Sequence, residues 1–203
     1  MVKLAEIKQE NILCAAVEIF QAKGLEQASM EAISKQAEVS KRTLYKYYPT
    51  KEALFSAIVE RLFANVISIH QIAFDATQSV ADQLTDVARQ EVDLVSSECF
   101  ISLARVVCSE SIRSQKYASL ILQDVQQLEN CKGLEKWIRG GIEAGKLNVD
   151  CPHIASEQFL SSLKCITFYP QLFAHQPPAS EAEREIAIKM AVKQFVNTYE
   201  KTN

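Results

Sequence analysis

The sequence predicts an all-α protein with two parts, an N-terminal three-helix domain containing a helix-turn-helix and a C-terminal helical bundle. Of 203 residues, 48% are hydrophobic, and the chain has only five glycines and five prolines. Long apolar runs with helical spacing are therefore seldom interrupted, and no run shows the alternation of a strand. We place the boundary after residue 49, which gives domains 1–49 and 50–203.

The first helix is predicted from the spacing of its apolar residues. Leu13, Ala16, Val17 and Phe20 stand at i, i+3, i+4 and i+7, which is typical of one face of an amphipathic helix. Gly24 follows where a helix can stop, because glycine readily adopts the left-handed backbone that ends many helices.

A short second helix is predicted to begin after Ser29, whose hydroxyl can cap the first free amides. Its apolar face is formed by Met30, Ile33 and Ala37. Glu38 and the residue after it then form a tight turn.

The third helix is predicted to begin at Ser40, a second capping residue, with Val39 packing on Leu44 as a hydrophobic staple. Pro49 disfavours helical backbone just before it, so this helix is short. Thr50 can cap a fourth helix. Two short helices joined by a tight turn and braced by a third match the helix-turn-helix arrangement. The apolar face of the fourth helix is Leu54, Phe55, Ile58 and Leu62.

Longer helices are predicted beyond residue 62, with breaks near 76–79, 111–115, 145–152 and 176–180. The segment 100–108 is apolar almost all round, which favours a place at the centre of the bundle. The last helix begins with a capping box of Ser180 and Glu183. Its apolar face is Ile188, Val192, Phe195 and Tyr199.

Positive charge is concentrated in one short segment. The formal net charge is −3, which excludes a protein that coats nucleic acid with its whole surface. Residues 39–51, however, hold four cations and no acid. Because salt screens charges beyond about 8 to 10 Å, this local excess governs what the segment binds. The pattern indicates a surface that contacts a polyanion.

A recognition helix places its first residues against base edges and its flanks against phosphates. Lys41, Arg42 and Thr43 occupy those first positions, and arginine can bind guanine through two hydrogen bonds. Tyr45, Lys46 and Tyr47 are better placed for the sugar-phosphate backbone. Lys51 starts the next helix, where its ammonium group and the free amides suit a phosphate.

The N-terminus, the histidines and the cysteines indicate the compartment and the absence of a cofactor. The N-terminus lacks a signal-peptide core, and no run of eighteen apolar residues occurs, so we expect a cytoplasmic protein. We expect no metal or other cofactor, because His70, His153 and His175 are scattered and no CxxC pair occurs. The six cysteines are expected to be reduced and mostly buried. They are Cys14, Cys99, Cys108, Cys131, Cys151 and Cys165.

These motifs together resemble the TetR family of transcriptional regulators over about fifty residues. The matching positions are Ile12-Leu13-x-Ala15-Ala16, Phe20-x-x-x-Gly24, Ser29-Met30-x-x-Ile33, Ala37-x-Val39-Ser40, Thr43-Leu44-Tyr45-x-Tyr47-Tyr48 and Lys51-Glu52-x-Leu54-Phe55. The resemblance implies an all-helical homodimer that binds operator DNA. Members of the family are usually repressors, in which a small molecule bound in the C-terminal domain moves the two DNA-binding domains of the dimer apart.

The resemblance also implies roles for single residues. Base contacts fall on Lys41, Arg42 and Thr43, and we expect phosphate contacts from Ser29, Ser40, Tyr45, Lys46, Tyr47 and Lys51. Glu38 stands where the family usually has the turn glycine, so we expect a strained or altered turn.

The C-terminal region resembles the AefR-like regulators in Leu103-Ala104-Arg105-Val106-Val107, Glu110 and Gly145-Lys146-Leu147. In the family the last two helices of each subunit pair into a four-helix dimer interface, which would cover the face from Ile188 to Tyr199.

An effector cavity is implied by the resemblance, and six large apolar residues are our candidates for its lining. Alternative functions are a thiol-responsive regulator of the same fold, or a helical dimerisation module without DNA binding. We do not expect an enzyme, because no nucleophile and base stand at a recognisable spacing. The six candidates are Phe100, Leu103, Val107, Trp137, Phe159 and Tyr169.

Overall fold

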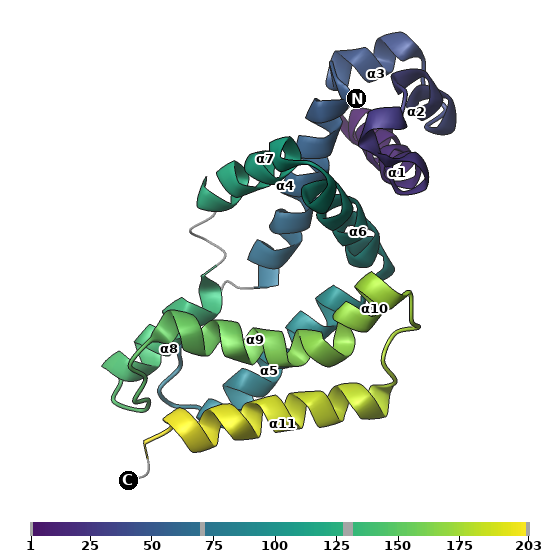
Figure 1. Ribbon diagram of the computed structural model, residues 1–203. Coiled ribbons are helices and arrows are strands. Elements are labelled where there is room, and N and C mark those ends of the chain that lie inside the picture. Colours follow the sequence, from purple (N-terminus) through teal and green to yellow (C-terminus); the bar gives the residue numbers. More distant parts are fainter. Residues whose placement is uncertain (1, 70–71, 128–131, 202–203) are drawn as a thin grey trace. The chain divides into compact units, whose positions relative to one another are not determined.

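The computed structural model describes residues 2–69, 72–127 and 132–201, and the regular secondary structure within these ranges is helical apart from one isolated bridge between Leu147 and Glu200 (Figure 1). No helix in these ranges has both the length and the apolar character needed to cross a membrane. The helices are α1 (Val2–Gln27), α2 (Met30–Gln36), α3 (Lys41–Tyr47), α4 (Lys51–Ile69), α5 (Val80–Ser96), α6 (Glu98–Arg113), α7 (Gln115–Gln127), α8 (Gly133–Glu143), α9 (Pro152–Thr167), α10 (Tyr169–Ala174) and α11 (Glu181–Tyr199).

The chain forms two compact units, each built from two stretches of sequence. The first comprises Met1–Phe63 and Ser102–Leu128, and the second comprises Ala64–Ile101 and Glu129–Asn203. Helices α4 and α6 therefore each begin in one unit and end in the other. The division into domains 1–49 and 50–203 stays a prediction.

The predicted helix caps are confirmed. The hydroxyl of Ser29 accepts from the backbone N–H of Ala32 at 3.2 Å, and that of Ser40 accepts from Thr43 N–H at 3.1 Å. Thr50 accepts from the N–H three residues on in the same way, at 3.1 Å. The capping box of Ser180 is also present at the start of α11. Helices α2, α3, α4 and α11 therefore begin where a hydroxyl satisfies free amides.

Helix α1 is longer than predicted because it begins at Val2, but its helical backbone breaks at Gly24 as expected, with φ 75° and ψ 162°. Arg61 of α4 holds α1 through two bonds to the Glu10 carboxylate, Nη1 to Oε2 at 2.5 Å and Nη2 to Oε1 at 3.0 Å. The buried apolar residues of α1–α4 form the core beneath the turn. They include Ile12, Ala16, Phe20, Ile33, Leu44, Leu54, Phe55 and Ile58.

The second unit has its own core, in which α11 packs against α5 and α9. Trp137 of α8 is buried there between the rings of Phe74 and Phe195, at 5.1 and 6.3 Å between centroids. Its indole N–H donates to Gln83 Oε1 at 3.1 Å, which satisfies the polar atom of a buried aromatic side chain.

The expectation that a partner subunit covers the face from Ile188 to Tyr199 is wrong. Ile188, Val192 and Phe195 are buried in the core of their own chain, and the chain's own α5 and α9 cover α11. An apolar stripe in a sequence shows that a face is covered, but it does not identify what covers it. Other large apolar residues of α11 are exposed, Ile186 at 62% and Met190 at 63%.

The expectation of mostly buried cysteines is also wrong. Cys14, Cys99, Cys151 and Cys165 are exposed, and Cys108 is half-buried. Each exposed cysteine on a helix occupies a position outside the apolar stripe, so the helix turns it to solvent. Cys131 lies outside the described residues.

Glu38 has a φ of 53°, in the left-handed region that costs a residue with a side chain about 1 to 2 kcal/mol. We predict that Glu38→Gly raises the free energy of unfolding by about 1 kcal/mol in urea denaturation, since glycine removes the strain but gains unfolded-state entropy.

Lys35→Gly is the matched control, because this exposed helical residue has no strain to relieve. It should lower stability by about 0.5 to 1 kcal/mol. Equal loss of stability in both variants would contradict a strained turn.

Candidate nucleic-acid interface

The turn between α2 and α3 presents α3 to solvent. The N–H of Glu38 donates to Lys35 C=O at 3.2 Å, and the N–H of Val39 donates to Ser34 C=O at 3.0 Å. These bonds close the end of α2 and let the chain reverse into α3, which packs on α2. Leu44 is the buried residue of α3, so the rest of this seven-residue helix is available for contact.

The three residues predicted to contact bases differ in what already holds them. Lys41 Nζ lies 3.0 Å from the carboxylate of Glu31 in α2, and both side chains are exposed. The hydroxyls of Thr43 and Ser40 lie 2.8 Å apart and share a hydrogen bond. Arg42 is exposed and, within the described part of the chain, has no hydrogen-bond or ion-pair partner. Of the three side chains, that of Arg42 would therefore have no existing contact to break in binding a guanine edge.

The residues predicted to contact phosphates also lie at or near the surface. Tyr45 is 51% exposed, Ser29 and Ser40 are exposed caps, and Lys46 places its ammonium 5.7 Å from the ring centre of Tyr47. Tyr48 instead turns partly inward, where burial and the Glu10 carboxylate raise the pKa of its phenol.

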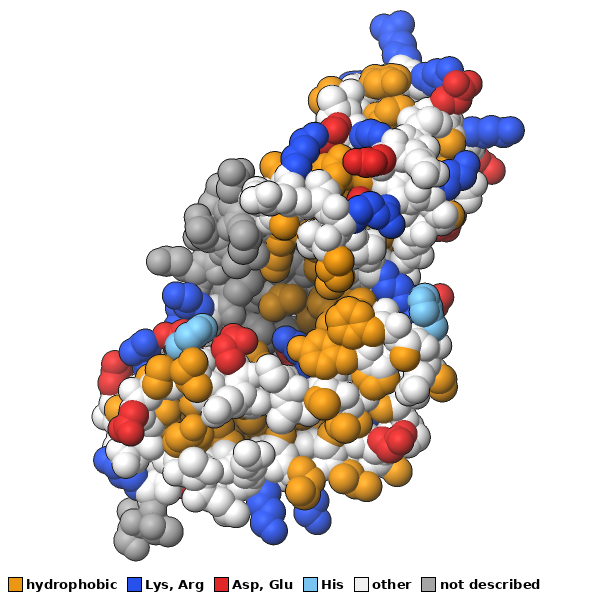
Figure 2. Space-filling model, viewed as in Figure 1, with side chains coloured by type: hydrophobic (Ala, Val, Ile, Leu, Met, Phe, Trp, Pro, Cys, Tyr) orange, Lys and Arg blue, Asp and Glu red, His pale blue; other side chains and the backbone are white. Residues whose placement is uncertain are grey.

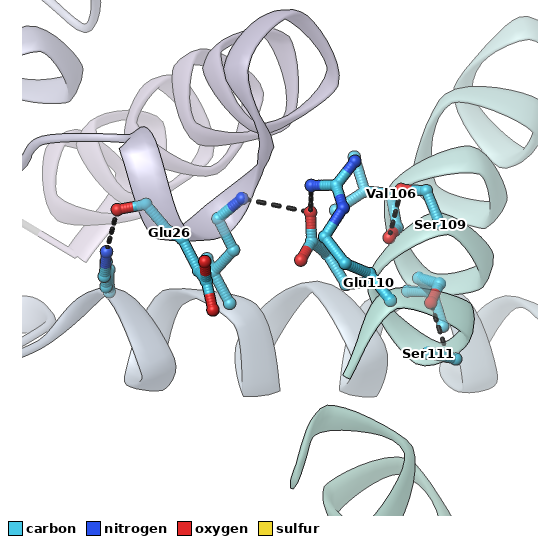
Figure 3. A network of polar contacts seen from close by, with 9 residues as sticks. Glu26, Val106, Ser109, Glu110 and Ser111 are labelled. Atoms are coloured by element: carbon cyan, nitrogen blue, oxygen red, sulfur yellow. Dashed lines mark hydrogen bonds and ion pairs between the residues drawn. The ribbon is translucent and has the colours of Figure 1, made fainter. Parts of the chain in front are cut away.

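Lys51 has a structural contact that the sequence reasoning missed. Its Nζ donates to the backbone C=O of Glu26 at 2.6 Å and so joins the start of α4 to the end of α1 (Figure 3). An ammonium group has three donors, so a phosphate contact is compatible with this bond. Replacing Lys51 would remove the bond to the Glu26 carbonyl as well as any phosphate contact.

Acidic residues lie near α3, a feature that the charge composition of the segment 39–51 did not predict. Glu31 stands beside Lys41, and Glu38 lines a shallow groove with Asn11, Cys14 and Glu18 of α1. Figure 2 shows acidic side chains interspersed among the Lys and Arg side chains of this part of the surface. The sequence shows that Glu31 stands in the first turn of α2. Its pairing with Lys41 could not be predicted from the sequence, because it depends on the geometry of the turn between α2 and α3.

The six candidates for an effector cavity are divided between the two units. Leu103 and Val107 belong to the first unit, and the four aromatic residues belong to the second. There, Trp137 and Phe159 both contact the ring of Phe195, while Phe100 and Tyr169 both contact Phe168. Trp137 is 1% exposed and belongs to the core, whereas Tyr169 is 38% exposed. Ligand contact by these residues stays a prediction.

Metal-binding side chains do not gather into a site within the described ranges, where no group of three His, Cys, Asp or Glu residues could hold an ion. His70 lies outside these ranges.

Two family models match the chain. Residues 12–58 match the tetR family of bacterial regulatory proteins, and residues 82–201 match the C-terminal domain of AefR-like transcriptional repressors. The chain is 40% identical over 67 residues to a transcriptional regulator of Bacillus subtilis, YvdT, and this match covers 33% of the chain and 34% of that protein. The chain thus matches about a third of that relative's length.

Solved structures resemble the chain over almost its whole length. A TetR family regulator from Pseudomonas syringae pv. tomato has a TM-score of 0.86 at 29% identity, covering 97% of this chain and 98% of the other. The flavonoid-responsive regulator FrrA has a TM-score of 0.70 at 26% identity, with the same coverage of both chains.

The geometry and the comparisons agree. An exposed, capped α3 that carries the exposed Arg42 lies within residues 12–58, which match one family model, and the C-terminal model covers more than half of the chain. This protein belongs to the TetR family of bacterial transcriptional regulators and is a DNA-binding regulator of transcription.

Proposed function

We propose that the chain is a homodimeric repressor that binds a near-palindromic operator with two copies of α3 and releases it when a small molecule binds its C-terminal part. The observation that carries the DNA-binding mode is the exposed start of α3, where Arg42 has an unoccupied guanidinium group among the described residues. A helix fits the major groove, and its first residues reach the base edges there.

The roles of the flanking residues follow from the same placement. Lys41 can bind DNA once it leaves Glu31, and an exposed ion pair of this kind costs less than about 1 kcal/mol to break. Ser29, Ser40, Tyr45, Lys46, Tyr47 and Lys51 contact phosphates on either side. These contacts orient α3 without reading sequence.

Release by a small molecule is supported by the AefR-like C-terminal match and by the likeness to FrrA, a flavonoid-responsive regulator. In this chain the ligand would contact residues among Phe100, Leu103, Val107, Trp137, Phe159 and Tyr169. Apolar walls with few polar groups are typical of small-molecule sites.

The dimer is supported by an exposed apolar surface on α9 and α11. Ile166, Ile186 and Met190 are 48%, 62% and 63% exposed, and all three line a groove of about 420 Å³ between the two helices. Clustered large apolar side chains on a surface mark an interaction site. We place the dimer contact on this groove, which we call the α9–α11 groove.

The protein acts on DNA in the cytoplasm in this proposal, and it needs no enzymatic activity or cofactor. The matched relatives are transcriptional regulators.

A thiol-responsive regulator of the same fold is the second candidate, because four cysteines are exposed. Burial raises the pKa of the Cys108 thiol, which leaves it less thiolate and less reactive. Loss of operator binding on treatment with diamide, restored by dithiothreitol, would favour this candidate. Unchanged binding would favour the small-molecule mechanism.

We predict that Arg42→Ala and Lys46→Ala weaken binding in different ways, measured by fluorescence anisotropy on duplexes selected from a random library. Loss of Arg42 should abolish the preference at one base pair in each half-site, worth about 1 to 3 kcal/mol. Loss of Lys46 should weaken binding to all sequences and reduce the log-log salt slope by about 2, from two lost phosphate contacts per dimer.

Lys136→Ala serves as the control because this exposed lysine belongs to the second unit. Its salt slope and base preference should equal those of the unmodified protein. Identical changes in Arg42→Ala and Lys46→Ala would contradict the division between base and phosphate contacts.

For the dimer we predict that Ile186→Asp yields a monomer at micromolar concentration in analytical ultracentrifugation, because a carboxylate cannot be buried unpaired in an apolar contact. Ile112→Asp is the matched control, since Ile112 is 82% exposed on α6 and lies outside the α9–α11 groove. A persistent Ile186→Asp dimer would place the contact elsewhere.

A further inference from the structure

Glu110 is a fully buried acid that joins α6 to the end of α1. Its exposed fraction is 0%, and its Oε1 accepts two hydrogen bonds at 3.0 Å, one from the backbone N–H of Leu25 and one from Arg113 Nη1 (Figure 3). Leu25 and Glu110 are 85 residues apart in sequence. Burying a carboxylate is costly unless it is paired, so these two bonds to Oε1 offset part of the burial, while Oε2 is buried without a hydrogen-bond partner among the described residues.

The backbone at Gly24 creates the donor that Glu110 uses. With φ 75° and ψ 162° at Gly24, the helical bonding of α1 is interrupted, and the next helical turn starts with the N–H of Leu25. A carboxylate is favoured at such a start because the first amides lack helical partners. A Cβ on Gly24 would lie 2.2 Å from Arg113 Nη1, so the absence of a side chain lets the Glu110–Arg113 pair approach.

A second bond between the same helices lies one turn away on α1. Gln21 Nε2 donates to the backbone C=O of Ser102 at 2.9 Å. Ser102 and Glu110 are eight residues apart on α6, or about 12 Å along the helix axis. Two bonds separated along both helices resist rotation as well as sliding, so they fix the angle between α1 and α6.

Helix α6 is well placed to transmit a change to this junction. Its first residues, up to Ile101, belong to the second unit, and the rest belongs to the first unit with α1–α3. Helix α7 adds contacts to α4 within the first unit, where the rings of Phe55 and Tyr117 lie 5.3 Å apart and Lys116 Nζ lies 3.3 Å from Glu52. A shift of α6 therefore reaches α1 through Glu110 as well as reaching α4.

We propose that Glu110 is a positioning residue that sets the angle between α6 and the reading head, which consists of α1–α3. This angle would determine the half-site spacing that the dimer accepts. This inference rests on the proposed operator-binding homodimer. Each half-site must meet an α3 at the correct spacing and rotation, and one added base pair rotates a half-site by about 34°. A head held at two points discriminates between spacings, whereas a head held loosely tolerates them.

The test compares binding to a selected operator and to versions with one base pair added or removed between the half-sites. We expect Glu110→Ala to reduce the ratio of affinities between the best and altered spacings by about tenfold, because the head loses preorganisation. Glu110→Gln keeps an oxygen acceptor for Leu25 N–H and should keep most of the ratio. Hydrogen exchange of the peptide spanning residues 21–27 should be faster in the alanine variant alone.

The matched control is Glu91→Ala, which removes a buried acid of the second unit that pairs with Lys164 Nζ at 3.1 Å. Its melting temperature should fall, but its spacing preference should not change. Gln21→Ala removes the other bond through an exposed residue and tests the junction if Glu110→Ala does not fold. It should relax the spacing preference in the same direction.

An unchanged spacing preference in folded Glu110→Ala, or in Gln21→Ala should the alanine variant not fold, would overturn the inference. An equal relaxation in Glu91→Ala would overturn it too, because the effect would then reflect general destabilisation. Failure of the unmodified protein to select any duplex would instead overturn the proposed operator binding, and this inference with it.

Discussion

Helix α3 is too short to be stable by itself, and this constraint shapes the whole first unit. It has seven residues, whereas isolated helices below about 12 to 15 residues are marginal in water. Leu44 anchors α3 in the core, and Ser40 caps its start. The turn bonds at Glu38 and Val39 fix its direction from α2. The exposed surface of α3 can therefore consist of polar and charged residues, because others hold the helix in place.

The support for α3 continues through polar contacts between helices. Glu10 and Arg61 join α1 to α4, and Lys51 joins the start of α4 to the carbonyl of Glu26. Glu110 then joins α6 to the same end of α1. Packed apolar faces tolerate small sliding, whereas hydrogen bonds with fixed geometry do not. The residues around the end of α1 thus connect the reading head to a helix that the second unit shares.

Features that depend on local chemistry were predictable from the sequence. The caps at Ser29, Ser40 and Thr50 need only a hydroxyl followed by a helix, and the stop at Gly24 needs only a residue that tolerates positive φ. The family resemblance was carried by these same residues, so the fold class and the position of α3 in the sequence followed directly.

Features that depend on distant partners were not predictable. The pairing of Glu110 with Leu25 spans 85 residues, and no local pattern around either residue identifies the other as its partner. The apolar stripe of α11 identified a covered face but not that α5 and α9 of the same chain cover it. The same limit explains the exposed cysteines, since residue type alone does not determine which face of a helix turns outward.

The central claim is that α3 reads base edges in the major groove, and methylation protection of guanine N7 tests it directly because N7 lies only in that groove. On a selected operator the account predicts two groups of protected guanines, with centres about one helical turn or more apart, and loss of protection at one position in each group with Arg42→Ala. Unprotected guanine N7 throughout a bound operator, with protection confined to adenine N3 in the minor groove, would contradict it.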